Sequence, residues 1–232
     1  MTATYPGHEL EIFSKASHWK AYWRGKIASH VHGAVLEVGA GIGANTTALT
    51  GLTYDSWLCL EPDRELASRI EVPSARHRVV TGTIGDLPAG RGFDTILYLD
   101  VLDHIADDRA EMASAARRLN PGGTIIVLAP ALSFLFSPFD RAIGHYRRYD
   151  RATLRAAAPS GLREVKIVYL DCCGLLASLG NRMFLGSAMP SERQILAWDT
   201  FLVPLSPRTG QHLYRRFLRR TRKPRLPSSA RL

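Results

Sequence analysis

The sequence contains few cysteines and no long apolar run. Only three of its 232 residues are cysteines, Cys59, Cys172 and Cys173, and their spacing matches no disulfide framework and no zinc site. We therefore expect a protein of a reducing compartment, without a bound metal. No apolar segment approaches the roughly 18 residues that a membrane-spanning helix requires, and residues 1–10 lack the basic and apolar regions of a signal peptide. These absences predict a cytoplasmic protein.

Acidic residues are absent after Asp199, although basic residues are frequent there. The whole chain has 30 lysines and arginines against 21 aspartates and glutamates, a formal net charge of +9. All of that excess lies beyond Asp199, so residues 1–199 are neutral in sum. A neutral body offers no general attraction for phosphates, which argues against a nucleic acid partner.

The basic C-terminal segment leaves two interpretations open. In a helix, one face would carry Leu213, Tyr214, Phe217 and Leu218, with arginines on the others. Such a helix could contact an anionic membrane surface peripherally, whereas the alternative is a solvated, partly disordered end. The preceding residues 171–207 are rather apolar and predict a helical cover over an acceptor pocket. A hydrophobic or lipid-linked acceptor would fit both features.

Short apolar segments alternate with amphipathic ones along most of the chain, which is typical of a parallel sheet with helices. Strands are expected over residues 34–38, 57–60, 78–80, 93–99, 124–128 and 165–170. Helices are expected over residues 8–31, 44–50, 64–70 and 107–119. The alternation predicts an α/β fold, namely a Rossmann-like, doubly wound and mostly parallel sheet with helices on both faces.

The same pattern divides the chain into four parts. We expect N-terminal lid helices over residues 1–32, a cofactor-binding core over 33–170, the cover over 171–207 and a basic tail over 208–232. Long connections often carry function, so residues 130–160, which follow the fifth strand, are expected on the acceptor side.

The clearest motif is Gly39-Ala40-Gly41-Ile42-Gly43, which separates the first strand from a helix. Glycines permit a sharp turn and let a ligand approach the backbone closely. About 20 residues later, Glu61 follows the second strand, where a carboxylate can accept hydrogen bonds from both hydroxyls of a ribose. Asp86 follows the third strand and could accept the exocyclic amine of an adenine. Together these features predict a site for a nucleoside-type cofactor.

Two cofactors compete for this site, a nicotinamide dinucleotide and S-adenosylmethionine. The spacing G-x-G-x-G differs from the dinucleotide pattern G-x-G-x-x-G. Glu37, two positions before the first glycine, would repel a pyrophosphate and attract the sulfonium and ammonium groups of S-adenosylmethionine. The residues therefore favour S-adenosylmethionine.

At this point the sequence resembles the class I S-adenosylmethionine-dependent methyltransferase superfamily. The matching segments occur in the order and at the intervals of that superfamily. They are LEVGAGIGANT (36–46), CLEPD (59–63), Gly85-Asp86-Leu87, FDTILYLDVLDHI (93–105) and LNPGGTIIVLAP (119–130). The segments WKAYWRGKI (19–27) and DRAIGHYRRYDRATL (140–154) extend the resemblance toward a bacterial small-molecule branch, the type 11/12 kind.

The resemblance implies which residues bind the cofactor. Glu37, Gly39, Ala40, Gly41 and Gly43 would line its methionine part, Glu61 would hold the ribose, and Pro62 and Asp63 would lie beside the adenine. Asp86 and Leu87 would also contact the adenine, Asp100 and Val101 would face the sulfonium, and the lid aromatics Trp19 and Tyr22 would lie near the cofactor.

The C-terminus departs from the superfamily pattern. The family usually closes its sheet with an antiparallel sixth and seventh strand, and the seventh should fall near residues 211–223. That segment carries many arginines, which disfavours an inner strand. We expect either an edge strand or a shorter sheet with a helical tail.

Methyl transfer is an in-line displacement at a carbon that a sulfonium group already activates. The protein must align the acceptor and exclude water, and a hydroxyl acceptor also needs a base. His104 and His145, which follow the fourth and fifth strands, are the candidate catalytic bases, because histidine titrates near neutral pH. His145, Arg148 and Tyr149 are the candidates for binding the acceptor, since arginine suits an acidic group.

The sequence thus favours an S-adenosylmethionine-dependent methyltransferase that acts on a small-molecule or lipid-linked acceptor. The alternatives are an NAD(P)-dependent oxidoreductase and a non-catalytic regulator that binds S-adenosylmethionine. A nucleic acid methyltransferase is a weaker alternative, because the chain lacks an Asn/Asp-Pro-Pro-aromatic motif.

Overall fold

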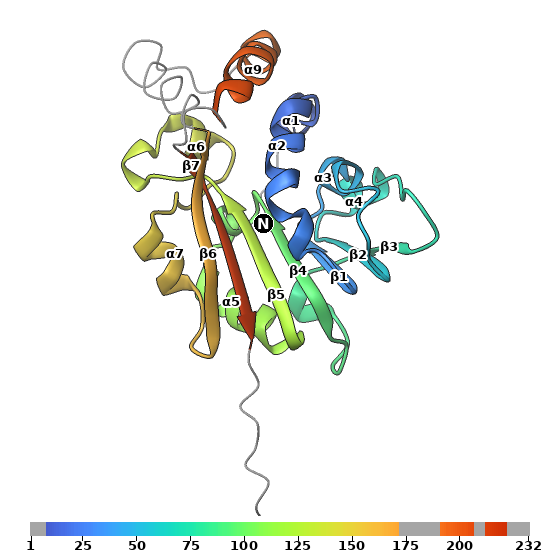
Figure 1. The fold of residues 1–232 in the computed structure, drawn as a ribbon. Coiled ribbons are helices and arrows are strands. Elements are labelled where there is room, and N and C mark those ends of the chain that lie inside the picture. Colours follow the sequence, from blue (N-terminus) through green and yellow to red (C-terminus); the bar gives the residue numbers. More distant parts are fainter. Residues whose placement is uncertain (1–7, 172–190, 207–211, 222–232) are drawn as a thin grey trace, which may run out of the picture.

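A seven-stranded sheet with the order β3-β2-β1-β4-β5-β7-β6 forms the centre of the protein (Figure 1). The computed structural model describes residues 8–171, 191–206 and 212–221. The strands are β1 (Ala34–Val38), β2 (Ser56–Glu61), β3 (His77–Thr81), β4 (Phe93–Leu99), β5 (Leu119–Ala129), β6 (Leu162–Asp171) and β7 (His212–Thr221).

Helices flank the sheet and lie along one of its edges. They are α1 (His8–Ser14), α2 (Ser17–Ile27), α3 (Ala44–Ala48), α4 (Arg64–Ser68), α5 (Asp108–Arg117), α6 (Pro138–Ala142), α7 (Arg151–Ala157) and α9 (Glu192–Ala197). Short helical turns are η1 (Ala28–His30), η2 (Ile84–Asp86), η3 (Leu102–His104), η4 (Ser133–Leu135), η6 (Trp198–Leu202) and η7 (Val203–Leu205). The segments α1, α2, α6 and α9 lie near the top of Figure 1.

Strands β1 to β5 are parallel, so their carboxyl ends share one edge of the sheet. From β1 the chain moves outward to β2 and β3, and it then returns to place β4 on the other side of β1. Loops that leave β1 and β4 therefore diverge, which opens a crevice at this edge. The expected Rossmann-like α/β fold is confirmed.

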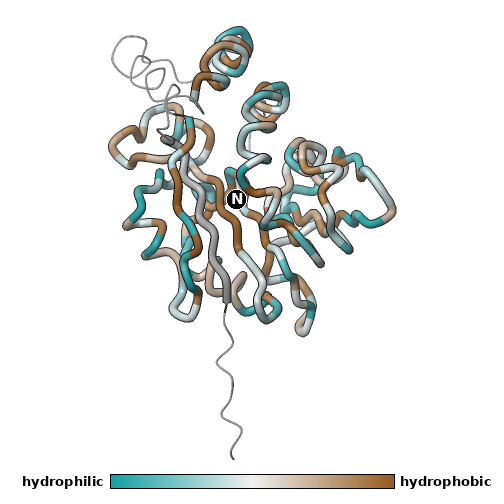
Figure 2. The backbone as a smooth tube through the Cα atoms, viewed as in Figure 1, coloured by the Kyte–Doolittle hydropathy of each residue, from teal (hydrophilic) through white to brown (hydrophobic). Residues whose placement is uncertain are grey.

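Each face of the sheet carries its own hydrophobic core, because successive strand residues point to opposite faces. In β4, Leu97 packs with α2 and α3 on one face, and Tyr98 packs with α5 and α7 on the other. The middle of β4 (Ile96–Leu99) and the end of β5 (Ile125–Ala129) are continuous apolar runs, as parallel strands covered on both faces require. Figure 2 shows these apolar residues along the central strands.

The C-terminal strand corrects both sequence-based alternatives. Strand β7 is antiparallel to β5 and to β6 and lies between them, so it is neither an edge strand nor a helix. Backbone hydrogen bonding on both sides outweighs the low strand preference of an arginine-rich segment. Residues 212–221, expected as part of a basic tail, therefore belong to the sheet, and the amphipathic membrane helix expected there does not form.

Most other elements agree with the sequence-based expectations to within a few residues. Two differ, because β5 begins at Leu119 rather than at residue 124, and the single helix expected over residues 8–31 is divided into α1, α2 and η1. The lid region contains α1 and α2, and the described part of the cover, residues 191–206, is helical as predicted. The rest of the cover, residues 172–190 and 207, lies outside the described part of the chain. Among the helices that the structure describes, none is long and apolar enough to cross a membrane.

The position of β7 leads to a first prediction. A chain that ends after Ser206 should lose its cooperative thermal unfolding transition, because β5 and β6 lose their shared partner strand. That loss should exceed the roughly 5–15 kcal/mol by which a domain of this kind is stable. A chain that ends after Thr221 keeps β7 and serves as the control, and circular dichroism during heating compares the two. Equal melting curves would contradict the placement of β7.

Candidate cofactor and acceptor site

A cleft of about 180 Å³ opens at the carboxyl edge of the parallel strands. Its lower wall comes from the glycine turn after β1 and the ends of β4 and β5, and its upper wall comes from α1, α2, α6 and η6. The lining includes Phe13, Trp19, Lys20, Gly39, Ala40, Gly41, Asn45, Asp100, His104, Phe139, His145, Arg148 and Trp198. The cleft thus brings together part of each expected set, namely five residues expected at the cofactor with His104, His145 and Arg148, whereas Glu61 lies outside its lining.

The glycine turn requires glycine at Gly39. This residue has φ of 66°, and a Cβ there would lie 2.6 Å from Cγ1 of Val101. The N–H groups of Gly39 and Ala40 donate to the carbonyl of Leu60, at 2.7 and 3.1 Å. Because the turn is tied to the end of β2 and packed against the loop after β4, its backbone forms a preorganised wall of the cleft.

Glu61 is hydrogen-bonded to the backbone of this turn. Its side chain is buried, and Oε2 accepts a hydrogen bond of 2.8 Å from the N–H of Gly41. Oε1 accepts a bond of 3.0 Å from the N–H of Asp63. Burial raises the pKa of Glu61, although the two backbone hydrogen bonds oppose the shift. The carboxylate is therefore fixed between the glycine turn and the start of α4. A ribose hydroxyl could donate to it there in place of one of the two backbone N–H groups.

Glu37 lies beneath the glycine turn and does not line the cleft. It is 1% exposed, and Oε2 accepts hydrogen bonds from Thr46 Oγ1 at 2.7 Å and Trp57 Nε1 at 2.9 Å. Burial raises the pKa of Glu37 to about 7, against the effect of these two hydrogen bonds. Glu37 thus joins α3 to β2 through these two hydrogen bonds. Its charge could influence a charged cofactor only across the glycine turn that lies above it.

The other residues expected at the cofactor fall into two groups. Trp19, Gly39, Ala40, Gly41 and Asp100 line the cleft, whereas Tyr22, Gly43, Pro62, Asp63, Asp86, Leu87 and Val101 do not. Asp86 is exposed and caps η2, since its Oδ2 accepts hydrogen bonds of 2.7 Å from both N–H and Oγ1 of Thr83. These hydrogen bonds lower the pKa of Asp86. Leu87 is buried in the core on the α5 face, so its side chain is a packing residue.

One buried carboxylate joins the lid to the cover. Asp199 in η6 is 2% exposed and accepts hydrogen bonds from the N–H groups of His18 at 3.1 Å and Trp19 at 2.7 Å. These N–H groups belong to the first turn of α2, which has no partners for them within the helix. Trp19 also contacts Trp198, with ring centroids 5.8 Å apart. The lid and cover therefore form one wall over the cleft.

Lys20 was not predicted from the sequence as a site residue, yet it lines the cleft. Its Nζ donates to the carbonyls of Phe13 at 2.6 Å and Ser14 at 3.2 Å. Burial lowers the pKa of Lys20 to about 8, although the charges of Asp100 and Asp199 oppose the shift.

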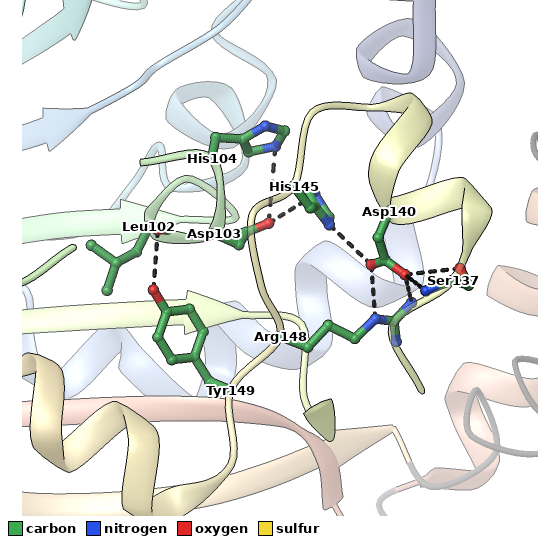
Figure 3. Close-up of polar contacts among 8 residues, drawn as sticks. All are labelled: Leu102, Asp103, His104, Ser137, Asp140, His145, Arg148 and Tyr149. Carbon is green, nitrogen blue, oxygen red and sulfur yellow. Dashed lines mark hydrogen bonds and ion pairs between the residues drawn. The ribbon is translucent and has the colours of Figure 1, made fainter. Parts of the chain in front are cut away.

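The acceptor side of the cleft is organised around Asp140 in α6 (Figure 3). Asp140 is fully buried and accepts bonds from Arg148 Nε at 2.8 Å and Nη2 at 2.9 Å. It also accepts bonds of 2.8 Å from N–H and Oγ of Ser137, and of 3.1 Å from His145 Nδ1. Despite burial, which raises the pKa, these partners hold the pKa of Asp140 well below its usual range. Arg148, expected to bind the acceptor, thus directs its guanidinium at Asp140.

His145 lies between two carboxylates. Its Nε2 lies 2.8 Å from Oδ2 of Asp103, and its Nδ1 faces Asp140. Burial alone lowers the pKa of His145, but contacts with Asp103 and Asp140 outweigh burial and raise it to about 9. The two carboxylates thus favour the protonated form of His145, which argues against its acting as a free catalytic base.

His104 is the more accessible of the two histidines. Its side chain is 23% exposed, against 7% for His145, and the two rings meet edge to face with centroids 4.5 Å apart. Nε2 of His104 lies 3.9 Å from Oδ2 of Asp103. Asp103, His104 and His145 thus place three ligand-type atoms within 4.8 Å of one another, beside the cleft.

Tyr149 corrects one expectation about the acceptor. Its side chain is fully buried on the α5 face of the sheet, and it does not line the cleft. Its hydroxyl lies 3.1 Å from the carbonyl of Leu102 and 2.9 Å from Oδ2 of Asp108, to which it donates (Figure 3 shows the first contact). Burial and the charge of Asp108 raise the pKa of Tyr149 well above its usual value. Tyr149 therefore anchors the loop that presents His145 and Arg148.

Sequence reasoning missed Lys20, Asp103, Asp140 and the aromatic wall formed by Phe13, Phe139 and Trp198. Asp103 directly precedes His104 and Asp140 lies five residues before His145, so proximity in sequence was the available signal. The wall residues come from three distant segments, and no local pattern links them.

Comparisons with known proteins concern the family and the fold of the chain. A model of a methyltransferase domain family matches residues 12–167. No curated protein sequence matches the chain.

Solved structures share the fold at low sequence identity. A complex that contains the Haloferax volcanii Trm112 methyltransferase activator has a matching chain with 16% identity and a TM-score of 0.66, covering 97% of this chain and 100% of that one. An S-adenosylmethionine-dependent methyltransferase from Mesorhizobium loti matches with 14% identity, a TM-score of 0.62 and coverage of 90% and 99%. The plantazolicin methyltransferase BpumL, solved with S-adenosylhomocysteine, matches with 10% identity, a TM-score of 0.54 and coverage of 92% and 84%.

The environment of Glu37 leads to a second prediction. Its pKa is about 7 in the folded protein against 4.5 in the reference state, so the folded state binds more protons between these values. Stability should therefore fall as pH rises from about 4.5 to about 7, by at most about 3 kcal/mol from this group. Glu37→Gln keeps an acceptor for Thr46 and Trp57 but cannot ionise, so it should lack this component.

Urea denaturation of the ligand-free protein at several pH values measures the effect. The exposed Glu65 supplies the matched control, Glu65→Gln, which should follow the wild-type pH profile. If Glu37→Gln and the wild type lose stability in parallel across this range, the buried carboxyl is not the cause.

Proposed function

The chain belongs to the methyltransferase domain family and is an S-adenosylmethionine-dependent methyltransferase, and from that premise we propose that it methylates a small, largely apolar or lipid-linked acceptor. The observation that carries the proposal is the cleft itself. It joins the glycine turn on one side to a wall of aromatic and aliphatic side chains on the other. Methyl transfer requires the donor and the acceptor to be bound side by side, because proximity and alignment supply most of the rate enhancement.

The cofactor is proposed to lie across the crevice between β1 and β4. Glu61 is already held against the backbone of the glycine turn, and it accepts the ribose hydroxyls in place of the N–H of Gly41 or Asp63. Gly39, Ala40 and Gly41 let the methionine part approach the backbone, and Asp100 at the end of β4 attracts the sulfonium. The adenine lies toward Pro62, Asp63 and Asp86, which is the order that the family resemblance implies.

The acceptor is proposed to lie between the loop around α6 and the cover. Phe139 and Ile143 on one side and Phe13 and Trp198 on the other form a wall that favours an apolar body. Phe201, three residues after Trp198 in η6, is 70% exposed, so η6 carries a further exposed apolar side chain. An acceptor with a long apolar portion therefore fits this side of the cleft better than a fully polar one.

The reacting atom of the acceptor is proposed to lie beside His104. This histidine combines exposure to the cleft with a position after β4, close to Asp100 and hence to the sulfonium region. His145 acts as a positioning residue, because Asp103 and Asp140 hold both of its ring nitrogens. The C–S bond breaks as the methyl carbon passes in line to the acceptor.

A third prediction tests the cofactor site. Glu61→Gln replaces a carboxylate that can accept from two hydroxyls by an amide with one acceptor oxygen. Binding of S-adenosylhomocysteine, measured by isothermal titration calorimetry, should weaken by about 10-fold or more, the cost of one or two charge-assisted hydrogen bonds. Glu65→Gln, on the surface of α4, is the matched control and should bind as the wild type does. Unchanged affinity of Glu61→Gln would remove Glu61 from the site.

A fourth prediction tests the acceptor class. The protein is incubated with S-adenosylmethionine labelled in the methyl group and with a cell extract, and the products are separated into organic-extractable, water-soluble small-molecule and macromolecular fractions. Label should accumulate in the organic-extractable fraction, with little in RNA or protein, and Glu61→Gln should reduce it. Label confined to macromolecules would overturn the proposed acceptor, and cofactor binding without any transfer would favour a non-catalytic regulator.

A further inference from the structure

Asp103, His104 and His145 form a cluster whose geometry the methyl transfer proposal does not explain. Two imidazoles and one carboxylate place their ligand-type atoms within 4.8 Å of one another. Asp103 and His104 come from η3 after β4, and His145 comes from the loop after α6. Figure 3 shows both histidine rings directed at the Asp103 carboxylate.

Within the described part of the chain, the carboxylate of Asp103 has ion-pair contacts with His104 and His145 but no aligned hydrogen bond. Its side chain is fully buried, and neither oxygen accepts a hydrogen bond from the part of the chain that the structure describes. The 2.8 Å contact with His145 Nε2 is close in distance but does not have hydrogen-bond alignment. A buried carboxylate without hydrogen bonds is costly, and such groups are paired or coordinate metals.

A second layer of side chains fixes the ring of His145. Its Nδ1 faces Asp140 Oδ1 at 3.1 Å, and Asp140 is itself held by Arg148 and Ser137. Histidines that bind metals usually donate their other ring N–H to a carboxylate in this way, which fixes the tautomer and directs the free nitrogen to the ion. Asp140 thus leaves Nε2 of His145 as the ligand atom toward Asp103.

Backbone contacts hold the two segments of the cluster together. The N–H of Tyr146 donates to the carbonyl of Asp103 at 2.8 Å, and the N–H of His145 donates to the carbonyl of Asp140 at 2.8 Å. Metal sites require ligands on such supported elements, because small displacements abolish the geometry. His104 and His145 also line the cleft, so a further coordination position would face the acceptor.

We propose that Asp103, His104 and His145 bind a divalent transition metal ion at the acceptor end of the cleft. Two imidazoles with one carboxylate suit zinc, manganese, iron or cobalt better than magnesium or calcium, which prefer oxygen ligands. Three protein ligands with an open position are typical of catalytic metal sites. The sequence-based expectation of no metal rested on the spacing of the cysteines. That spacing gives no information about a site built from two histidines and an aspartate.

The metal site deepens the proposed function and rests on it for its substrate class. The open position takes an oxygen of the acceptor, so the acceptor is a hydroxyl compound. Coordination promotes loss of the hydroxyl proton to solvent. The oxygen lone pair then forms the bond to the methyl carbon, the bond from that carbon to sulfur breaks, and its electron pair stays on sulfur. The products are a methyl ether, S-adenosylhomocysteine and one proton.

Cobalt(II) is the probe for the test, because it reports coordination by visible absorption without any acceptor. The untagged full-length protein is freed of metals with a chelator, dialysed and titrated with Co²⁺. We expect visible absorption bands of protein-bound Co²⁺ that saturate at about one equivalent per chain, as one three-ligand site requires. Zn²⁺ should displace the cobalt and remove the bands.

His104→Ala is the most informative variant, since His104 is partly exposed and its truncation leaves the buried ion pairs intact. It should weaken Co²⁺ binding at least about 10-fold and change the spectrum. Asp140→Asn, which loosens the ring of His145, should weaken Co²⁺ binding about 10- to 100-fold. His32→Ala is the matched control, because His32 is exposed at the opposite end of β1, and it should bind Co²⁺ as the wild type does.

Calorimetry with S-adenosylhomocysteine on the same samples separates the two proposals. Normal binding of S-adenosylhomocysteine with no cobalt spectrum would overturn the metal site and leave the methyltransferase proposal standing. A cobalt spectrum unchanged in both His104→Ala and Asp140→Asn would place the ion elsewhere and would also overturn the site. The site would be supported if the wild type and His32→Ala show the same saturable cobalt spectrum while His104→Ala and Asp140→Asn do not. Labelled methyl transfer should then fall at least about 10-fold in the metal-free enzyme and recover with added metal.

Discussion

The divergence of the chain at the carboxyl edge of β1 and β4 is the constraint on which the site depends. Because five parallel strands end at the same edge, the loops after β1, β2, β4 and β5 meet there. The glycine turn can occupy this crowded position because Gly39 adopts φ of 66° and presents no Cβ to Val101. The sheet edge therefore supplies the wall of the cleft that is proposed to bind the cofactor, and α1, α2, α6 and η6 supply the opposite wall.

Buried carboxylates connect helices and loops outside the strands of the sheet, namely the lid, the cover and the loop after α6. Asp199 caps the first turn of α2 from the cover, and Asp171 at the end of β6 accepts bonds of 2.7 Å from Trp198 and 2.8 Å from Ser206. Asp140 holds Arg148, Ser137 and His145 in one loop. Each of these carboxylates is buried and has several donors, as the cost of desolvating a charge requires. Asp103 differs from them, because within the described residues it contacts His104 and His145 without an aligned hydrogen bond, and the proposed metal site accounts for this difference.

The two sides of the cleft are built by different means. On the cofactor side, backbone groups and the conformation of glycine define the surface, so few side chains can be changed without altering the turn. On the acceptor side, a polar cluster lies beside aromatic residues from α1, α6 and η6. Site residues rather than the fold decide which acceptor such an enzyme takes, since one fold can serve many substrates.

The sequence alone determined the order of strands and helices, the glycine turn and the position of Glu61, because these depend on local periodicity and on backbone conformation. It also singled out His104 and His145, but it could not distinguish an exposed ring from one held between two carboxylates. Tyr149, Leu87 and Glu37 were expected at ligands and lie in the cores or beneath the turn, because the face that a side chain takes depends on packing. Only the tertiary structure placed β7 between β5 and β6, where backbone pairing on both sides overrides strand preference. Only it brought Asp103 and Asp140 to His145, since the loops that carry them meet through long-range contacts that no local pattern encodes.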